Sequence, residues 1–204
     1  MKAFNTKRMA LNKNLEECKQ KAKINETLGI MSKPVNKKVA VILDGKERKT
    51  TKALIKAGWN RKNIHIPNKS DDYPPIKKCH PNTYDMYLYD FLLMHRRKKK
   101  SIGLIYMDYM CTLPGNDECK PMDDLNLLFK NNMMATNCML GITLSINRSA
   151  KNESGFIAPD IIKTISIVQE LASGAKSRAQ LITEAGGMYR NGGNMFTLLF
   201  KILK

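Results

Sequence analysis

Long apolar runs and acidic residues are both scarce in this chain of 204 residues. Its apolar stretches fall short of the roughly 18 residues that a membrane-spanning helix needs, so no such span is predicted. Residues 1–8 carry charges with no apolar stretch behind them, which is not the pattern of a secretory signal. The sequence therefore favours an intracellular protein, in the cytoplasm, the nucleus or a virion.

Cysteine is present, but not in a pattern that builds a metal site or a set of disulfides. The five cysteines are odd in number, no Cys-x-x-Cys pair occurs, and Cys111 and Cys119 stand eight residues apart. The three histidines are scattered, with no second ligand nearby in the sequence. These spacings favour reduced thiols and predict no bound metal.

Basic residues far outnumber acidic ones: 35 Lys and Arg stand against 18 Asp and Glu, a formal net charge of +17. An excess of this size favours an anionic polymer, DNA or RNA, as a partner. Five consecutive cations at the end of a predicted helix are expected to contact phosphates: Arg96, Arg97, Lys98, Lys99 and Lys100. The alternative is a solvated helix end within a lysine-rich composition that serves solubility.

A strand that ends in an acidic turn and leads into a helix marks the candidate ligand site. The apolar residues 39–43 are followed by Asp44 and Gly45, and a helix is predicted over residues 51–57. In a parallel α/β sheet a ligand meets the carboxyl end of such a strand and the free amides of the next helix. Asp44, Gly45, Thr50 and Thr51 are therefore candidate ligand contacts. Helix capping is the alternative, and it accounts for Thr50 better than for Asp44.

Strands and helices alternate along most of the chain, which predicts an α/β fold with a mostly parallel sheet. Strands are predicted at residues 39–43, 63–68, 76–79, 102–108 and 138–146, and helices at 51–57, 83–99, 122–130 and 159–174. Two final strands are predicted at 179–183 and 194–203. They are separated by Met188-Tyr189-Arg190-Asn191-Gly192-Gly193, a turn signal that predicts an antiparallel hairpin.

The first 38 residues differ in character from the rest. Residues 1–38 are polar and basic, and the one helical stretch, from Asn14, has only a thin apolar stripe. They are predicted to form a basic N-terminal arm that is loosely packed or ordered by a partner. The α/β domain is predicted to comprise residues 39–204.

The element order and the acidic turn resemble those of the class I S-adenosylmethionine-dependent methyltransferases, over residues 39–204. This resemblance implies a Rossmann-like three-layer sandwich, with a mostly parallel sheet that ends in an antiparallel hairpin. It also implies that S-adenosylmethionine lies against the Asp44-Gly45 turn. In the family an acid after the second strand binds the ribose. Here Asn68 has that place, with Asp71 just beyond it.

Two features depart from the family pattern. The family's Gly-x-Gly loop is reduced to Gly45, and residues 46–49 are charged where small residues are usual. The same stretch ends in Lys49-Thr50, as a phosphate-binding loop does, but Arg48 replaces the glycine that must precede the lysine. A nucleotide-phosphate enzyme that depends on Lys49 is therefore a third, minor interpretation.

The resemblance places the catalytic segment at the end of the fourth strand, where Asp108 and Tyr109 are the candidate catalytic residues. Amine-methylating relatives carry Asp-Pro-Pro-Tyr there, whereas this chain has Asp-Tyr-Met-Cys. If Asp44 and Asp108 both end parallel strands, they are expected to lie side by side at one rim of the sheet and to border a shared crevice.

A 2′-O-methyltransferase combines an aspartate at this position with lysines and a glutamate. Arg148 after the fifth strand and Glu184 near the sixth imitate part of that set, with Lys37 or Lys38 ahead of the first strand. Arg148 is the third candidate catalytic residue, although an arginine does not give up a proton as a lysine does.

Two functions of different class follow from these residues. The first is a methyltransferase domain that acts on, or is docked to, nucleic acid, with Asp108 orienting or deprotonating the acceptor. The second is a catalytically inactive descendant, a basic structural or nucleic-acid-binding protein of a nucleoprotein particle or virion, which the reduced glycine loop favours.

Overall fold

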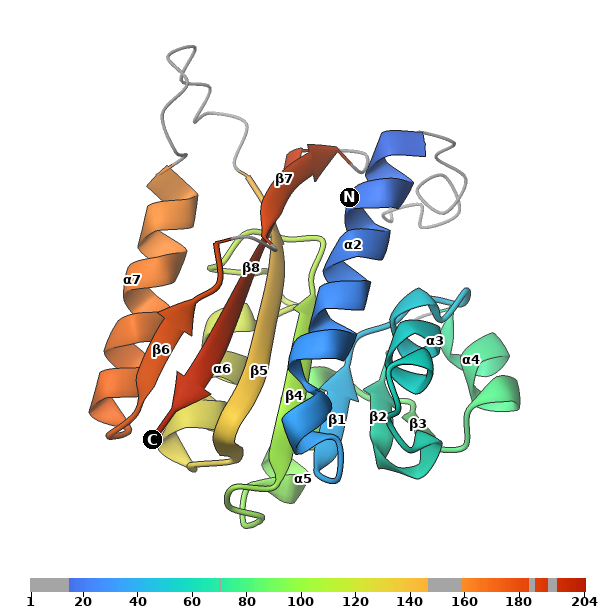
Figure 1. Cartoon of the computed structure of the whole chain (residues 1–204), viewed down its shortest axis with the longest axis horizontal. Helices are drawn as coiled ribbons and strands as arrows, with labels where there is room; N and C mark the ends of the chain where they lie inside the picture. Colours follow the sequence, from blue (N-terminus) through green and yellow to red (C-terminus); the bar gives the residue numbers. More distant parts are fainter. Residues whose placement is uncertain (1–14, 70, 147–158, 184–185, 191–193) are drawn as a thin grey trace.

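A mixed eight-stranded sheet forms the centre of the protein, with the strand order β3-β2-β1-β4-β5-β8-β6 and β7 paired with β8 (Figure 1). The computed structural model describes residues 15–69, 71–146, 159–183, 186–190 and 194–204. Strands β1 to β5 pair in parallel, whereas β6, β7 and β8 pair antiparallel. Their bounds are β1 Val39–Ile42, β2 Ile64–Pro67, β3 Thr83–Tyr84, β4 Ile102–Asp108, β5 Met134–Ser145, β6 Arg178–Leu181, β7 Gly187–Arg190 and β8 Asn194–Leu203.

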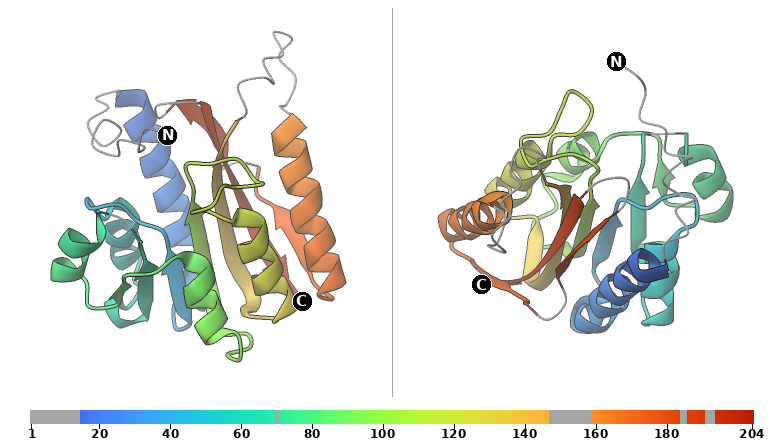
Figure 2. Two further views of the ribbon diagram at one scale, coloured as in Figure 1. Left: turned by 180° about the vertical axis from the view of Figure 1, so that it is seen from behind. Right: turned by 90° about the horizontal axis from the view of Figure 1, so that it is seen from above.

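Helices cover both faces of the sheet, so the molecule has three layers (Figure 2). One apolar core lies between the sheet and the helices α2 Leu15–Met31, α3 Lys49–Lys56 and α4 Tyr73–Cys79. The other core lies between the sheet and α5 Leu88–His95, α6 Pro121–Lys130 and α7 Pro159–Gly174. Short 3₁₀ turns occur at Lys33–Val35 and Arg61–Asn63. The predicted α/β sandwich with a mostly parallel sheet is confirmed.

The central strands are apolar along their length because both of their faces are covered. Consecutive residues of β5 alternate between the two cores: Cys138 belongs to the core of α5 to α7, and Met139 to the core of α2 to α4. Gly141 lies where β4, β5 and α2 come close together. A Cβ atom there would stand 2.7 Å from the Tyr106 ring and 3.3 Å from the Leu28 side chain.

Two of the predicted elements are wrong at the β3 edge of the sheet. Residues 76–79, predicted as a strand, belong to the helix α4, and the edge strand is Thr83–Tyr84 instead. The prolines that follow Tyr73 explain the error, because proline is favoured in the first turn of a helix. The helix predicted over 83–99 is correspondingly shorter and begins at Leu88.

The expectation of a loosely packed arm is wrong for the part of residues 1–38 that the structure describes. Residues 15–31 form the 17-residue helix α2, and its Ile24 and Leu28 side chains are fully buried. Trp59, after α3, donates a hydrogen bond from Nε1 to Ser32 Oγ at 2.9 Å. A thin apolar stripe suffices because Ile24 and Leu28 join a core to which β1, β4 and α3 also contribute side chains.

The C-terminal part matches the prediction closely. β8 covers the predicted residues 194–203 and pairs antiparallel with β6, as predicted. Residues 188–190 were predicted to lie in the turn, but they belong to β7, which also pairs antiparallel with β8, from Gly187↔Thr197 to Arg190↔Asn194. The turn residues 191–193 lie outside the described residues. Within the part of the chain that the structure describes, no helix is long and apolar enough to cross a membrane.

Replacing Leu28 by alanine tests whether α2 is integral to the fold. Removing a fully buried leucine should lower the free energy of unfolding by about 2–5 kcal/mol. Ile30 on the same helix is 54% exposed, so Ile30→Ala should change it by no more than about 0.5 kcal/mol. Urea unfolding of the two variants measures the difference, and equal losses would contradict the packing described here.

Candidate active site

Asp44 and Asp108 lie next to each other at the carboxyl ends of two adjacent parallel strands. The register pairs Ile42 of β1 with Tyr106 of β4, and each acid follows two residues later. The Leu43 N–H donates to the Tyr106 carbonyl at 3.0 Å, which extends the pairing toward the acids. The side-by-side placement predicted from the sequence is thus present, whereas the shared crevice stays a prediction. Asn68 follows β2 at the same edge, and these three residues are called the rim below.

Side-chain alternation directs both carboxylates to the face that α2 and α3 cover. In β1, Ala40 and Ile42 belong to the core on that face, and in β4 Leu104 and Tyr106 do. Since every second residue of a strand points the same way, Asp44 and Asp108 also face α2 and α3.

Asp44 is bound to the first turn of α3. Its Oδ2 accepts hydrogen bonds from the Thr51 backbone N–H at 2.8 Å and from Thr51 Oγ1 at 2.7 Å. The pKa of Asp44 is raised to about 6: burial raises it most, and nearby Asp108 adds to the rise, whereas the Thr51 hydrogen bonds and Lys21 partly oppose it. The residue at the helix N-cap position, Arg48, makes no capping hydrogen bond with its side chain. Asp44 therefore performs the capping role that the sequence left as an alternative.

Asp108 forms an ion pair with Lys21 of α2, which the sequence analysis missed. The two side chains are 13% and 25% exposed. The second carboxylate oxygen, Oδ1, is buried and has no hydrogen-bond partner among the residues that the structure describes. Buried acceptors are almost always hydrogen-bonded. Asp108 therefore has capacity for one more donor.

The lysine beside Asp108 is Lys21, and not Lys37 or Lys38, which the sequence suggested ahead of the first strand. Lys37 and Lys38 are exposed and precede β1, so they lie at its amino end, whereas Asp108 lies at a carboxyl end. A lysine reaches the rim from α2 instead, because the helix packs across the sheet. The sequence does contain a signal for Lys21: it precedes the apolar residues Ile24 and Leu28 by about one and two helical turns, so it lies on the same side of the helix.

The other candidate cofactor contacts differ in what they face. Asn68 Nδ2 donates to the Asp44 backbone carbonyl at 2.9 Å, which joins β2 to the turn after β1. Gly45 is exposed, and a Cβ atom on it would stand 3.5 Å from Asp72 Oδ2. Asp71 is exposed as well, so it is Asp72 that approaches the turn.

Thr50 does not face the rim. Its side chain is buried, and Oγ1 donates to Asn25 Oδ1 of α2 at 3.2 Å. The hydroxyl therefore joins α3 to α2. The sequence had suggested a ligand contact for Thr50 instead.

Tyr109 does not accompany Asp108. It is buried against the core of α5 to α7, and its hydroxyl donates a hydrogen bond to Asp124 of α6. One residue after Asp108, it points to the opposite face of the sheet. The predicted catalytic role of Tyr109 does not fit this geometry.

The remaining predicted residues are not brought to the rim. Arg148 and Glu184 lie outside the described residues. The five cations are exposed on the segment before β4: Arg96, Arg97, Lys98, Lys99 and Lys100. β4 runs from Ile102 to Asp108, so they lie about 20 Å from Asp108 at about 3.3 Å per residue. In the described part of the chain no cluster of three His, Cys, Asp or Glu side chains suits a metal ion.

Comparison with solved structures identifies the fold as that of the class I S-adenosylmethionine-dependent methyltransferases. The N-methyltransferase NodS from Bradyrhizobium japonicum WM9 superposes with a TM-score of 0.55 and 11% identity, over 94% of this chain and 99% of NodS. Trm1 from Pyrococcus horikoshii, solved as a complex with S-adenosyl-L-methionine, has a TM-score of 0.58 and 9% identity, over 91% of this chain and 56% of Trm1.

TYW2 from P. horikoshii, solved in complex with MeSAdo, has a TM-score of 0.51 and 10% identity, over 87% of this chain and 61% of TYW2. No protein-family model matches the sequence, and no curated protein matches it. At identities this low, the comparison shows the fold, and the resemblance inferred from the sequence is confirmed at that level.

Replacing Asp44 by asparagine should change how stability depends on pH. The pKa of Asp44 is raised from its usual 3.8 to about 6 by folding, so the folded state holds a proton that the unfolded chain has released. The free energy of unfolding of the wild type should therefore fall, relative to that of Asp44→Asn, by about 2–3 kcal/mol between about pH 4 and pH 7. Urea unfolding across this range measures it, and parallel curves for the two proteins would contradict a raised pKa.

Proposed function

We propose that the chain binds S-adenosylmethionine at the rim and transfers its methyl group to nucleic acid. The observation that carries the proposal is the pair of adjacent carboxylates at the carboxyl ends of β1 and β4, one of them with an unused buried acceptor oxygen. In open α/β sheets ligands bind outside the carboxyl ends of the strands. Trm1, which shares the fold, was solved with S-adenosyl-L-methionine.

The residues present fit such a cofactor. Asn68 and the exposed turn at Gly45 adjoin Asp44, and the oxygen of Asp108 that lacks a partner suits a hydroxyl or amine donor. When bound, S-adenosylmethionine supplies an electrophilic methyl group on a sulfonium sulfur. The protein's part is then to hold the acceptor atom in line with that methyl group.

Asp108 and Lys21 are the residues that we assign to the acceptor. Asp108 accepts a hydrogen bond from the acceptor hydroxyl or amine and orients its lone pair, and it takes up the proton that methylation releases. Lys21 balances the charge of Asp108 and holds its carboxylate in place through the ion pair. Lys21 is a long side chain that is 25% exposed, so it can shift to admit the acceptor.

Nucleic acid is the acceptor class that the charge favours. A formal net charge of +17 raises the local concentration of a polyanion and speeds its association with the protein. A neutral metabolite would gain nothing from such an excess.

A second function is favoured by the turn after β1. Asp44 is engaged by Thr51, and Arg48 adopts a left-handed conformation, φ 53°, where a phosphate- or cofactor-binding loop would have glycine. A side chain there occupies space that a cofactor needs close to the backbone. This observation favours an inactive methyltransferase-fold protein that binds nucleic acid as part of a particle.

Calorimetry with S-adenosylmethionine separates the two functions. We expect the wild type to bind with a dissociation constant on the order of micromolar, and Asp44→Asn to weaken binding at least tenfold because it removes a charge beside the cofactor. Asp123→Asn, an exposed acid of α6 on the other face, is the matched control and should bind as the wild type does. No heat from the wild type would contradict cofactor binding and leave the scaffold function.

Transfer of labelled methyl groups to RNA or DNA tests the roles of Asp108 and Lys21. Asp108→Asn should lower the rate by about 10²-fold or more, since a positioned acid or base contributes 10²–10⁴-fold. Lys21→Met should lower it as well, whereas Lys19→Met, at an exposed position of the same helix, should not. Cofactor affinity measured by calorimetry should stay within about threefold for Lys19→Met and Lys21→Met. Equal rates for these two variants would contradict the role of Lys21.

A further inference from the structure

The amino end of the sheet gathers cations from four separate parts of the chain. Residues 96–101 precede β4, residues 130–133 precede β5, residues 173–178 lead into β6, and residues 203–204 end β8. These four segments, called the amino-end surface below, are joined by hydrogen bonds. The Lys100 N–H donates to the Asn132 carbonyl at 2.9 Å, Lys204 Nζ donates to the Met134 carbonyl at 2.7 Å, and Arg178 pairs with Leu203.

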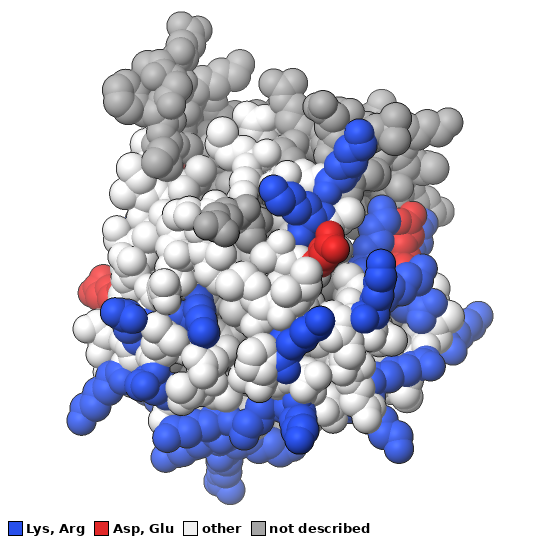
Figure 3. Space-filling model, in the orientation of Figure 1, with Lys and Arg blue, Asp and Glu red and all other residues white. Residues whose placement is uncertain are grey.

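None of these segments contains Asp or Glu. Their Lys and Arg side chains are all exposed: Arg96, Arg97, Lys98, Lys99, Lys100, Lys130, Lys176, Arg178 and Lys204. In the part of the chain that the structure describes, none of these cations lies within ion-pair distance of a carboxylate. Figure 3 shows the basic side chains along the lower edge of the molecule, with no acidic side chain among them in that view.

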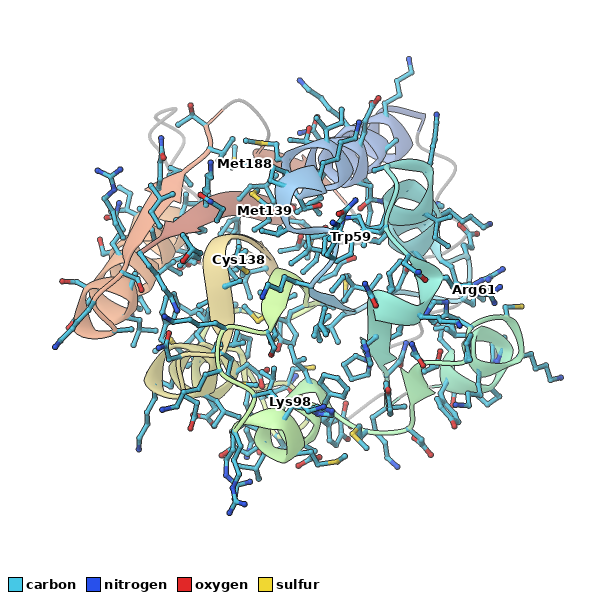
Figure 4. All side chains as sticks on the ribbon, turned by 60° about the horizontal axis from the view of Figure 1, so that its bottom comes forward. Trp59, Arg61, Lys98, Cys138, Met139 and Met188 are labelled. Atoms are coloured by element: carbon cyan, nitrogen blue, oxygen red, sulfur yellow. The ribbon has the colours of Figure 1, made fainter. Side chains whose placement is uncertain are left out.

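A shallow, open depression lies between the end of β8 and the turn before β6. Its volume is about 470 Å³, and it is lined by Ser173, Lys176, Ser177, Arg178, Leu203 and Lys204. Burial lowers the pKa of Lys204, and nearby Lys100 lowers it further. Like charges are therefore crowded beside the depression, and a bound anion would relieve their repulsion. Figure 4, in which this end of the molecule comes forward, shows Lys98 beyond the end of α5.

Helix ends explain only part of this charge. α5, α6 and α7 all end at this side of the sheet, where the negative ends of their dipoles favour cations such as Arg96, Lys130 and Lys176. That effect is confined to the last helical turn. It does not account for Lys99, Lys100, Arg178 or Lys204, which adjoin strands instead.

We propose that the amino-end surface is a docking site for the phosphate backbone of nucleic acid, separate from the rim. This proposal rests on the proposed function, which takes nucleic acid as the acceptor. It deepens that function because it assigns the phosphate backbone to the amino-end surface and the acceptor nucleotide to the rim. β4 separates the two ends of the sheet by about 20 Å, the length of its seven residues. A phosphate bound by Lys98 to Lys100 and a nucleotide at Asp108 would therefore belong to different segments of the same nucleic-acid chain. Contacts between lysine side chains and phosphates position the nucleic acid on the protein without recognising its base sequence.

Fluorescence anisotropy with a labelled RNA of random sequence, about 20 nucleotides long, tests the docking site on the full chain. Two triple variants remove charge from it: one replaces Lys98, Lys99 and Lys100 by Gln, and the other replaces Lys176, Arg178 and Lys204 by Gln. The matched control makes the same change in charge at three exposed lysines of other segments: Lys52, Lys56 and Lys62.

We expect each amino-end triple to weaken RNA binding at least tenfold near 0.1 M salt, and the control by less than threefold. The slope of log Kd against log salt should shrink by about 2 for each amino-end triple, because about 0.7–0.9 of a counterion is released per phosphate contact. Equal losses in all three triples would show that net charge alone drives binding, which would overturn the proposal. The proposal would also be overturned, in favour of a membrane, if the protein bound phosphatidylserine vesicles and not RNA, and if the two amino-end triples weakened that vesicle binding.

Calorimetry of the same triples keeps this proposal distinct from cofactor binding. Cofactor affinity should be unchanged in all of them, because the amino-end surface lies at the opposite end of the sheet from the rim. If the wild type binds RNA at this surface but shows no heat with S-adenosylmethionine, the docking site stands and the enzymatic function fails. If it binds the cofactor while the amino-end triples leave RNA affinity intact, the reverse holds.

Discussion

The parallel pairing of β1 with β4 is the constraint on which the rest of the candidate site depends. Because Ile42 is opposite Tyr106, strand alternation leaves no choice but to place Asp44 and Asp108 on one face, one strand spacing apart. Two carboxylates so close repel each other, and burial adds to the cost of ionising Asp44. Lys21 offsets both effects. Its place on α2 follows from packing, since Lys21, Ile24 and Leu28 lie on one side of the helix, three and seven residues apart.

Much of the fold could be predicted from the sequence where a strand is buried on both of its faces or a turn has a distinctive sequence. β4 and β5 are covered on both faces, so their continuous apolar runs identified them, and the Asn-Gly-Gly signal preceded β8 as expected. Parallel pairing then placed Asp44 and Asp108 at one edge without any knowledge of side-chain contacts. Prediction failed at the edge strand β3, which has only two residues and leaves no pattern to detect.

The site could be predicted only as far as strand ends determine it. Lys21 lies on a helix whose apolar stripe is too thin to reveal that it packs against the sheet, so its contact with Asp108 depends on tertiary structure. Tyr109 and Lys37 lie away from the rim for reasons that the sequence already contains. Alternation already turns the residue after Asp108 to the other face, and a residue just before a parallel strand lies at the end opposite the rim. Asp44 was ambiguous for a different reason, because a cap and a ligand contact require the same residue at the same place.

The two ends of the sheet differ in charge for reasons that bear on what each can bind. In a parallel α/β fold the helices begin near the carboxyl ends of the strands and end near their amino ends. At the rim, the positive start of α3 is already neutralised by Asp44, and Lys21 is paired with Asp108, so a phosphate gains little there. At the amino end, the cations exceed what the helix ends require. The charge therefore favours the amino end of the sheet over the rim for the polyanion docking that we propose. Docking at the amino end is common to the active and the inactive function that we propose, because only cofactor binding at the rim distinguishes the two.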